Sequence, residues 1–320
     1  MLDDTLTTIA SREDLTMYKY LIPILLTLLS TLTEASGSAT QVIAFAQDTM
    51  ANDFRKAQVY EVRDEIAKYP QLSFIYSDAK GQTSLMIRQI EGFIKQKVDL
   101  LILGTNDEKM IVPVVSKAHK AGIPVILLDR GILSDDYTSF IKYDNRKIGR
   151  IAGRFIAEKL NGKGKVLLLE GVQKIDVTKL RTLGFFDEIY KHKDIKVIKR
   201  TGNFLRKDSI IEMEKVLKKG IRVDAIFAES DSMLSGVRLV LKRYDINPAS
   251  VVMIGVDFIS ETQNAIRNGS QLASITYPLG GKKAVEVALK ILNGEQVPKQ
   301  ISITSELVTG NNVDKIEPIF

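Results

Sequence analysis

The chain has 320 residues, 45% hydrophobic and 26% charged, the proportions of a soluble globular protein with room for about two domains. It contains no cysteine and two histidines, which excludes disulfides, thiol nucleophiles and thiolate zinc sites and makes a histidine triad a poor fit. The net charge of +6 is spread along the chain, which favours a solvated surface over a nucleic-acid-binding patch. We therefore expect a protein that is not an enzyme and that needs no metal or cofactor.

The N-terminal residues carry the pattern of a secretory signal peptide. A short apolar run at 21–29 follows a lysine and precedes small residues through Ala39. Because this run is too short to span a bilayer comfortably, we expect 1–39 to be an N-terminal extension and signal peptide, cleaved after Ala35 or Ala39. The alternatives are an uncleaved membrane anchor and an internal helix. Translation can start at the first methionine or at Met17, and the mature protein is expected to be periplasmic or secreted and not membrane-spanning.

After this segment, short apolar runs typical of buried strands alternate with longer runs of helical periodicity. The strands are expected at 41–46, 72–76, 98–103, 123–128, 165–169, 195–198, 225–228, 251–256, 272–276 and 301–308. The helices are expected at 53–69, 83–97, 111–121, 145–160, 179–190, 207–219, 232–244 and 281–292. Such alternation is typical of parallel sheets with helical crossovers. Because the strands are too many for one sheet, we predict an α/β protein of two doubly wound parallel-sheet domains.

The strand at 123–128 ends in Asp129 and Arg130, a carboxylate beside a guanidinium. Ligands of open α/β sheets bind just beyond the carboxyl ends of strands, so both side chains are candidate ligand-binding groups. Pairing with each other or with a neighbouring helix fits the local pattern equally well. Asp257 and Ser230 follow two strands of the second half in the same way. We therefore expect a cleft between the domains that is lined by strand ends from both.

Several motifs together resemble the ribose/galactose-type periplasmic binding proteins, type I solute-binding proteins that share their fold with the ligand-binding domains of LacI-type repressors. They lie between about 41 and 309 and include Val98-Asp-Leu-Leu-Ile-Leu, Ile123-Pro-Val-Ile-Leu-Leu-Asp-Arg, Tyr143-Asp-Asn, Gly149-Arg-Ile-Ala-Gly, Ile254-Gly-Val-Asp and Leu272-Ala-Ser. The resemblance implies two lobes joined by a three-segment hinge, with crossings near 143–145, 277 and 303–305. It implies an N-terminal lobe of 40–143 plus 278–303 and a C-terminal lobe of 144–277 plus 304–320.

Members of this family clamp a small sugar between the lobes, with aromatic rings on its faces and polar side chains on its hydroxyls. Matched by motif, the resemblance implies these ligand-binding residues: Asn52, Phe54, Arg55, Asp129, Arg130, Lys179, Arg181, Phe204, Ser230, Asp257 and Tyr277. Some depart from the family's pattern: Arg55 replaces an aromatic, Lys179 an arginine and Ser230 an asparagine. Without the resemblance, the phenylalanines also fit a core, and Asp257 also fits a helix N-cap. Asp231 is expected to cap the helix that follows it.

The charges around the expected site bear on the ligand. Four cations (Arg55, Arg130, Lys179 and Arg181) would face Asp129 and Asp257. A neutral sugar would leave some of that positive charge unpaired and desolvated, which is costly. The sequence therefore favours an acidic or phosphorylated sugar-like ligand, with a neutral sugar as the alternative.

The resemblance implies a solute-binding protein that delivers a small sugar-like ligand to the permease of an ABC transporter. The alternative is a receptor of the same fold that signals to a membrane histidine kinase or chemoreceptor. Tyr277-Pro-Leu-Gly-Gly281 resembles a segment of family members that are fused to sensor kinases. A transcription factor would need a helix-turn-helix before residue 41, where the signal segment lies.

Overall fold

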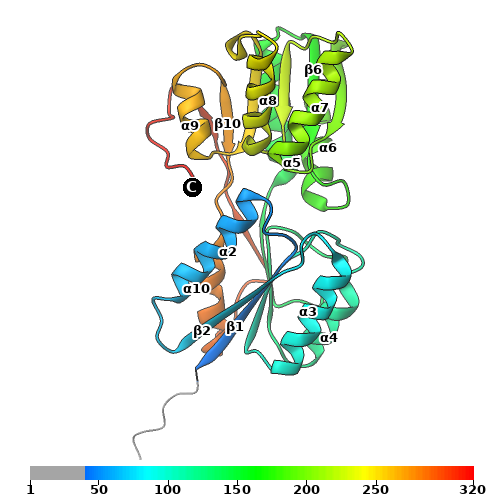
Figure 1. Cartoon of the computed structure of the whole chain (residues 1–320). Helices are drawn as coiled ribbons and strands as arrows, with labels where there is room; N and C mark the ends of the chain where they lie inside the picture. The colour runs from blue at the N-terminus through cyan, green and yellow to red at the C-terminus, as the bar shows by residue number, and fades with distance from the viewer. Residues whose placement is uncertain (1–39) are drawn as a thin grey trace, which may run out of the picture. The chain divides into compact units, whose positions relative to one another are not determined.

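The computed structural model describes residues 40–320, and the predicted signal segment lies outside the described residues. Within Gln41–Phe320 the strands form two six-stranded sheets, one in each lobe (Figure 1). The sheet of the N-terminal lobe has the order β11-β5-β4-β3-β1-β2 and contains β1 (Gln41–Gln47), β2 (Leu72–Asp78), β3 (Leu100–Gly104), β4 (Val125–Leu128), β5 (Ser139–Tyr143) and β11 (Gln300–Ile303). The sheet of the C-terminal lobe has the order β12-β10-β9-β8-β6-β7 and contains β6 (Lys163–Glu170), β7 (Asp194–Thr201), β8 (Ala225–Ala228), β9 (Val252–Asp257), β10 (Ala273–Thr276) and β12 (Leu307–Thr309). Their strand pairs are parallel except for β10 with β12.

Helices cover both faces of each sheet, as parallel sheets require. The N-terminal lobe contains α2 (Asp53–Ile66), α3 (Thr83–Gln96), α4 (Val112–Lys120) and α10 (Gly281–Leu292). The C-terminal lobe contains α5 (Asn145–Lys159), α6 (Asp176–Ile189), α7 (Arg206–Lys218), α8 (Asp231–Arg243), α9 (Ser260–Arg267) and a 3₁₀ turn at Pro248–Ser250. In Figure 1, α2 and α10 lie on one side of the N-terminal sheet, and α3 and α4 on the other.

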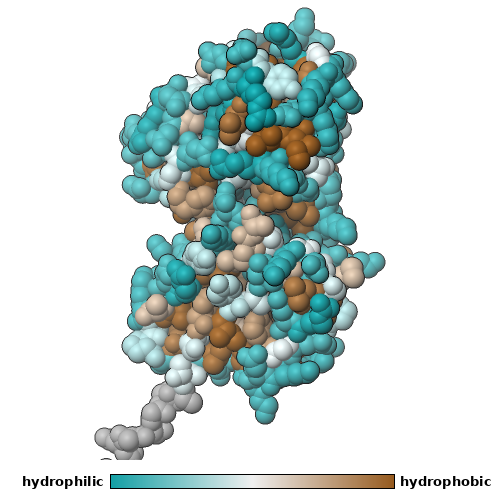
Figure 2. All heavy atoms as spheres, viewed as in Figure 1, coloured by the Kyte–Doolittle hydropathy of each residue, from teal (hydrophilic) through white to brown (hydrophobic). Residues whose placement is uncertain are grey.

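Alternation of side chains along each strand explains the two cores of a lobe. In β1, Ile43 and Phe45 belong to the core under α2 and α10, whereas Ala44 and Ala46 belong to the core under α3 and α4. In β6, Val166 and Leu168 belong to the core under α5 and α6, whereas Leu167 and Leu169 belong to the core under α7 and α8. Both sets are apolar, so central strands read as continuous hydrophobic runs. Figure 2 shows mostly hydrophilic residues on the face that it presents.

The chain crosses between the lobes three times: after β5, between β10 and α10, and between β11 and β12. The predicted pair of doubly wound domains with a three-segment hinge is thus confirmed. The single strand expected at 301–308 is wrong, because β11 and β12 belong to different sheets. The sequence analysis also missed β5, whose alternating residues are only half-buried and give no continuous apolar run, and the short helix α9.

Within residues 40–320, no helix combines the length and apolar character needed to cross a membrane.

Candidate ligand-binding site

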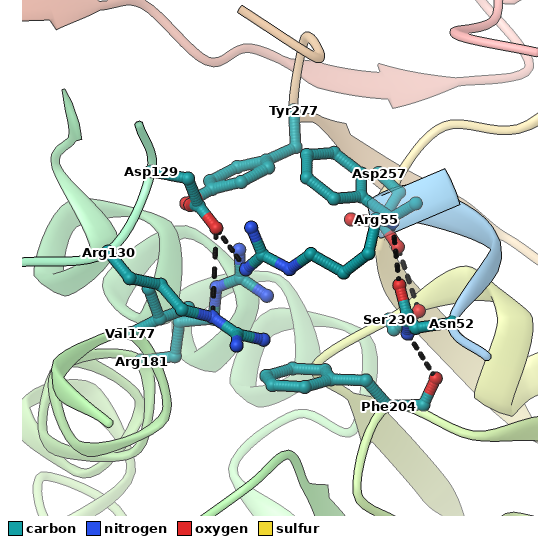
Figure 3. A pocket seen from close by; sticks show the side chains of 11 residues that line it. Asn52, Arg55, Asp129, Arg130, Val177, Arg181, Phe204, Ser230, Asp257 and Tyr277 are labelled. Carbon is teal, nitrogen blue, oxygen red and sulfur yellow. Dashed lines mark hydrogen bonds and ion pairs between the residues drawn. The ribbon is translucent and has the colours of Figure 1, made fainter. Parts of the chain in front are cut away.

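A cavity between the lobes gathers side chains from both sheets near the ends of β4, β8 and β9 (Figure 3). Its lining residues are Asn52, Phe54, Arg55, Asp129, Arg130, Val177, Arg181, Phe204, Ser230, Asp257 and Tyr277. The structure therefore brings together every residue expected from the sequence except Lys179, and it adds Val177. The enclosed space between these side chains is about 20 Å³, which is room for about one water molecule.

Asp129 lies directly after β4 and is 1% exposed. One carboxylate oxygen accepts a hydrogen bond from the Tyr277 hydroxyl, and the other pairs with the Arg55 guanidinium. Burial acts to raise the pKa of Asp129, but the positive charges of Arg55 and Arg130 outweigh burial and hold that pKa below its usual value. The carboxylate is therefore ionised and anchored at the centre of the cavity.

Two hydrogen bonds to residues outside the cavity lining hold Arg130 in place. Its Nη1 donates to Oδ2 of Asp48 at 2.7 Å and to the carbonyl oxygen of Thr105 at 3.0 Å. Its Nε is buried and has no hydrogen-bond partner among residues 40–320, although Asp129 lies 3.9 Å away. Since buried donors are normally satisfied, this N–H is available to a ligand.

Arg55 occupies the first turn of α2, and its guanidinium crosses the cavity to Asp129 (Figure 3). Its Nη1 donates to Oε1 of Gln58 at 3.1 Å, and the Gln58 amide in turn donates to the carbonyl oxygen of Leu279 at 2.7 Å. Asn52 caps α2 by accepting from the Arg55 amide at 3.0 Å. The helix N-terminus and the hinge segment therefore fix Arg55 together.

Asn52 also connects the lobes. Its Nδ2 donates to the carbonyl oxygen of Phe204 at 2.7 Å, across the cavity from α2 to the loop before α7. The hinge side of the cavity is aromatic: the Tyr277 ring lies 5.6 Å from that of Phe54 and 3.9 Å from that of Tyr143. These contacts bring both sheets and the second hinge crossing to one place.

Arg181 and Lys179 differ in position although both lie on α6. Nε of Arg181 donates to Oδ1 of Asn145 at 2.9 Å, and its guanidinium lies 4.5 Å from the Tyr277 ring centre. The structure does not bring Lys179 to the cavity, because its ammonium is half-exposed and pairs with Glu108 at 2.5 Å. Residues four apart share a helix face and residues two apart do not, so a helix that points Arg181 inward points Lys179 elsewhere.

Asp257 and Ser230 form the wall contributed by the C-terminal lobe. The Ser230 hydroxyl donates to Oδ2 of Asp257 at 2.8 Å. Burial raises the pKa of Asp257 to about 8, although the charge of Arg181 and the Ser230 hydrogen bond oppose the rise. The adjacent Glu229 is fully buried, and burial raises its pKa to about 8 as well. Both carboxyl groups are therefore mostly protonated at neutral pH.

Asp231 does not cap α8 as expected. Its carboxylate accepts from the backbone amide of Phe258 at 2.8 Å, from the Gln271 side chain at 2.8 Å and from the Ser274 hydroxyl. It therefore joins α8 to β10 and to the segment that follows β9.

Three lining residues have a left-handed backbone, which is uncommon for residues other than glycine. They are Asp129 with φ 73°, Phe204 with φ 60° and Asp257 with φ 111°. Such strain concentrates at functional sites, where the surrounding structure enforces it. The backbone thus marks the same cavity independently of its side-chain chemistry.

The sequence analysis missed the residues that hold the lining in place. Asp48, Gln58 and Asn145 are buried polar residues that orient Arg130, Arg55 and Arg181 respectively. Asp48 directly follows a buried strand, as Asp129 does, and this position is the one feature of the sequence that could have identified it as a site residue.

Comparisons with known proteins agree with this geometry. Residues 43–296 match the family model described as periplasmic binding protein domain. The ribose import binding protein of Bacillus subtilis (strain 168) is 30% identical over 83% of this chain and 87% of its own. A solute-binding protein from Bacillus halodurans C-125, solved with bound myo-inositol, is 28% identical, with a TM-score of 0.82 over 88% of this chain and 98% of that one.

A sensory protein is similar to the same degree. The fructose-binding periplasmic domain of a hybrid two-component system is 30% identical, with a TM-score of 0.80, and the match covers 86% of this chain and 92% of that one. Relatives of this kind are binding proteins rather than enzymes, as expected from the sequence. With the family model matching most of the sequence and the two-lobed fold in place, the chain belongs to the periplasmic binding protein family, in its ribose/galactose-type branch.

Proposed function

We propose that this protein is an exported solute-binding protein that clamps a small, neutral, polyhydroxylated ligand between its lobes and delivers it to an ABC transporter. The lobes are 40–143 with 278–303, and 144–277 with 304–320. The observation that carries the proposal is the cavity between the two sheets, in which carboxyl groups, guanidiniums and aromatic rings converge. Vicinal hydroxyls offer donors and acceptors together, which carboxylate and guanidinium groups match, and the C–H face of a sugar packs well on a ring.

The ion pairs favour a neutral ligand over the anionic one expected from the sequence. That expectation set four cations against Asp129 and Asp257, but Lys179 lies outside the cavity and Arg130 is paired with Asp48. Arg55 is paired with Asp129, and Arg181 lies near enough to Asp257 to oppose the rise in that carboxyl group's pKa. Three guanidiniums therefore face the Asp48 and Asp129 carboxylates and the mostly protonated Asp257. Arg181 also donates to Asn145 and to the carbonyl oxygen of Glu229, so the surplus of positive charge that favoured an anion is reduced.

Ligand entry requires the lobes to separate. The enclosed 20 Å³ is far below the roughly 300 Å³ or more of ordinary ligand pockets. Contacts that join the lobes, such as Asn52 with Phe204 and Lys179 with Glu108, keep the cavity closed. Hinge opening at the three crossings exposes Asp129 and Asp257 to a ligand, and the lobes then close around it.

A thermal-shift screen of the purified chain tests the proposal. The panel contains D-ribose, D-fructose, L-arabinose, xylitol and myo-inositol, with D-gluconate and ribose 5-phosphate as anionic counterparts. A neutral compound is expected to raise the melting temperature by mass action. Stabilisation by the anions alone would contradict the neutral ligand, and no stabilisation by any sugar or polyol would contradict the proposed function.

Sensing is a second candidate function, favoured by the likeness to the domain of a hybrid two-component system. In that case closure is read by a membrane kinase, and the same cavity is used. Ligand uptake by cells that lack the protein distinguishes the two functions. Uptake is lost if the protein serves a transporter and retained, with loss of the transcriptional response, if it serves a sensor.

A further inference from the structure

Gly171, the residue that follows β6, lies directly against the Phe204 ring. A β-carbon on Gly171 would lie 1.9 Å from Cζ of Phe204 and 2.3 Å from both of its Cε atoms. Because the two Cε atoms are equally distant and nearly as close as Cζ, the added methyl group would lie over the face of the ring rather than beyond its edge. The absence of a side chain at this position therefore lets the ring lie flat on the backbone.

The Phe204 ring separates Gly171 from the ligand space. Phe204 lines the cavity and Gly171 does not. In Figure 3 the ring forms one boundary of the space that Arg55 crosses. Displacing the ring from Gly171 therefore moves it toward the space that the ligand must occupy.

Other contacts restrict where the ring can go. The backbone of Phe204 is left-handed with φ 60°, and its carbonyl oxygen accepts from Asn52. The guanidiniums of Arg130 and Arg181 lie 5.8 Å and 5.9 Å from the ring centre. These guanidiniums lie over the ring and line the cavity, so with the backbone fixed the ring relieves a clash at Gly171 chiefly by shifting along its own normal, toward them.

We propose that Gly171 sets the width of the ligand slot, as a positioning residue that acts through the Phe204 ring. A methyl group at 171 forces the ring to retreat by roughly 1.5 Å to reach ordinary contact at 3.4 Å or more. A shift of that size would narrow the space that a flat sugar or cyclic polyol must enter when the lobes open, so the lack of a side chain at 171 leaves that space wider. The inference rests on the proposed function and adds a determinant of specificity to it.

A double-mutant cycle tests this role by calorimetry on the full chain, with the tightest binder among D-ribose, D-fructose, xylitol and myo-inositol. Gly171→Ala is expected to weaken binding at least tenfold. Phe204→Leu weakens binding by itself through loss of the stacking surface, but adding Gly171→Ala to it is expected to cost less than threefold more. Gly92→Ala is the matched control, since a β-carbon there meets nothing within 4 Å, and it should bind as the wild type does.

The smaller cost of Gly171→Ala in the Phe204→Leu variant distinguishes a positioning role from a general loss of structure. Unchanged binding by Gly171→Ala overturns the proposal, as does an equal loss whether Gly171→Ala is made in the wild type or in the Phe204→Leu variant. If Gly171→Ala does not fold, the double variant is compared with Phe204→Leu alone, and a tenfold deficit in the double variant overturns the proposal. If the wild type binds none of the four compounds, the proposed function fails and this inference fails with it.

Discussion

The two lobes contribute electrostatically different walls to one cavity: the N-terminal lobe supplies ion pairs, and the C-terminal lobe supplies a mostly protonated carboxyl group. In the N-terminal lobe, Asp129 and Asp48 lie within hydrogen-bonding distance of Arg55 and Arg130, so the four side chains hold one another. Against the effect of burial, the charges of the two arginines keep the pKa of Asp129 below its usual value. In the C-terminal lobe, Asp257 has a serine hydroxyl as its partner, and burial raises its pKa to about 8. The difference follows from what lies next to each carboxyl group, since both walls are equally buried.

This contrast assigns different tasks to the walls. The wall of the N-terminal lobe is organised before the ligand arrives, because its side chains already satisfy one another. The protonated carboxyl group of Asp257 can donate or accept a hydrogen bond, so it can adapt to the hydroxyl that it meets. We expect the first wall to supply most of the affinity and the second to make affinity and stability depend on pH.

Removing Asp129 should have the largest effect. Asp129→Ala leaves the buried Arg55 guanidinium without its carboxylate, although Arg130 keeps Asp48, so we expect ligand binding to weaken by roughly 2–5 kcal/mol. The free energy of unfolding should also fall. Calorimetry and urea denaturation measure both effects, and binding at wild-type affinity would show that the end of β4 is not the site.

Asp257→Asn should cost less than Asp129→Asn. Because the Asp257 carboxyl group is mostly uncharged at neutral pH, an amide replaces it at a cost of about 1 kcal/mol of binding, the value of one neutral hydrogen bond. At Asp129 the same change removes the charge with which Arg55 pairs. Equal losses at the two positions would contradict the electrostatic difference between the walls.

Stability should depend on pH in opposite directions for the two walls. The raised pKa values of Asp257 and Glu229 mean that the folded protein binds these protons more tightly than the unfolded chain does. Their contribution to the free energy of unfolding is therefore complete below about pH 4 and is lost as the pH rises toward about 8. Asp129 has a lowered pKa, so its contribution is present at neutral pH and is lost as the pH falls below its usual pKa.

Urea denaturation between pH 5 and pH 9 measures this dependence. Asp257→Asn combined with Glu229→Gln should flatten the loss of stability on the alkaline side, while Asp129→Asn should leave it unchanged. An unaltered slope in the double variant would show that these carboxyl groups ionise normally in the folded protein.

Lys179→Ala should have the smallest effect. Its pair with Glu108 joins the lobes at a half-exposed position, so we expect a change of at most about 0.5 kcal/mol in binding, diminished further by salt. Arg181→Ala is the comparison on the same helix and should weaken binding much more. A large effect of Lys179→Ala would place that side chain in the site after all.

Local sequence patterns predict the architecture and the strand-end residues of the cavity. Continuous apolar runs ending in Asp129, Ser230 and Asp257 indicate buried parallel strands, and the carboxyl ends of such strands meet at one edge of a sheet. Both conclusions depend on local periodicity, which a linear sequence records directly. The expected places of the other lining residues came instead from likeness to a family, and these residues are Asn52, Phe54, Arg55, Arg181, Phe204 and Tyr277.

Tertiary structure alone decided which groups pair and which way they face. The rotation of α6 against the sheet directs Arg181 rather than Lys179 to the cavity, and the partnership of Asp48 with Arg130 joins residues 82 positions apart. Whether residues 301–308 form one strand or two depended on their partners in two separate sheets. The absence of a side chain at Gly171 matters only because the Phe204 ring lies against it. Charge balance, pKa and close approach depend on distances in space between residues far apart in the chain, and those distances exist only once both lobes are folded.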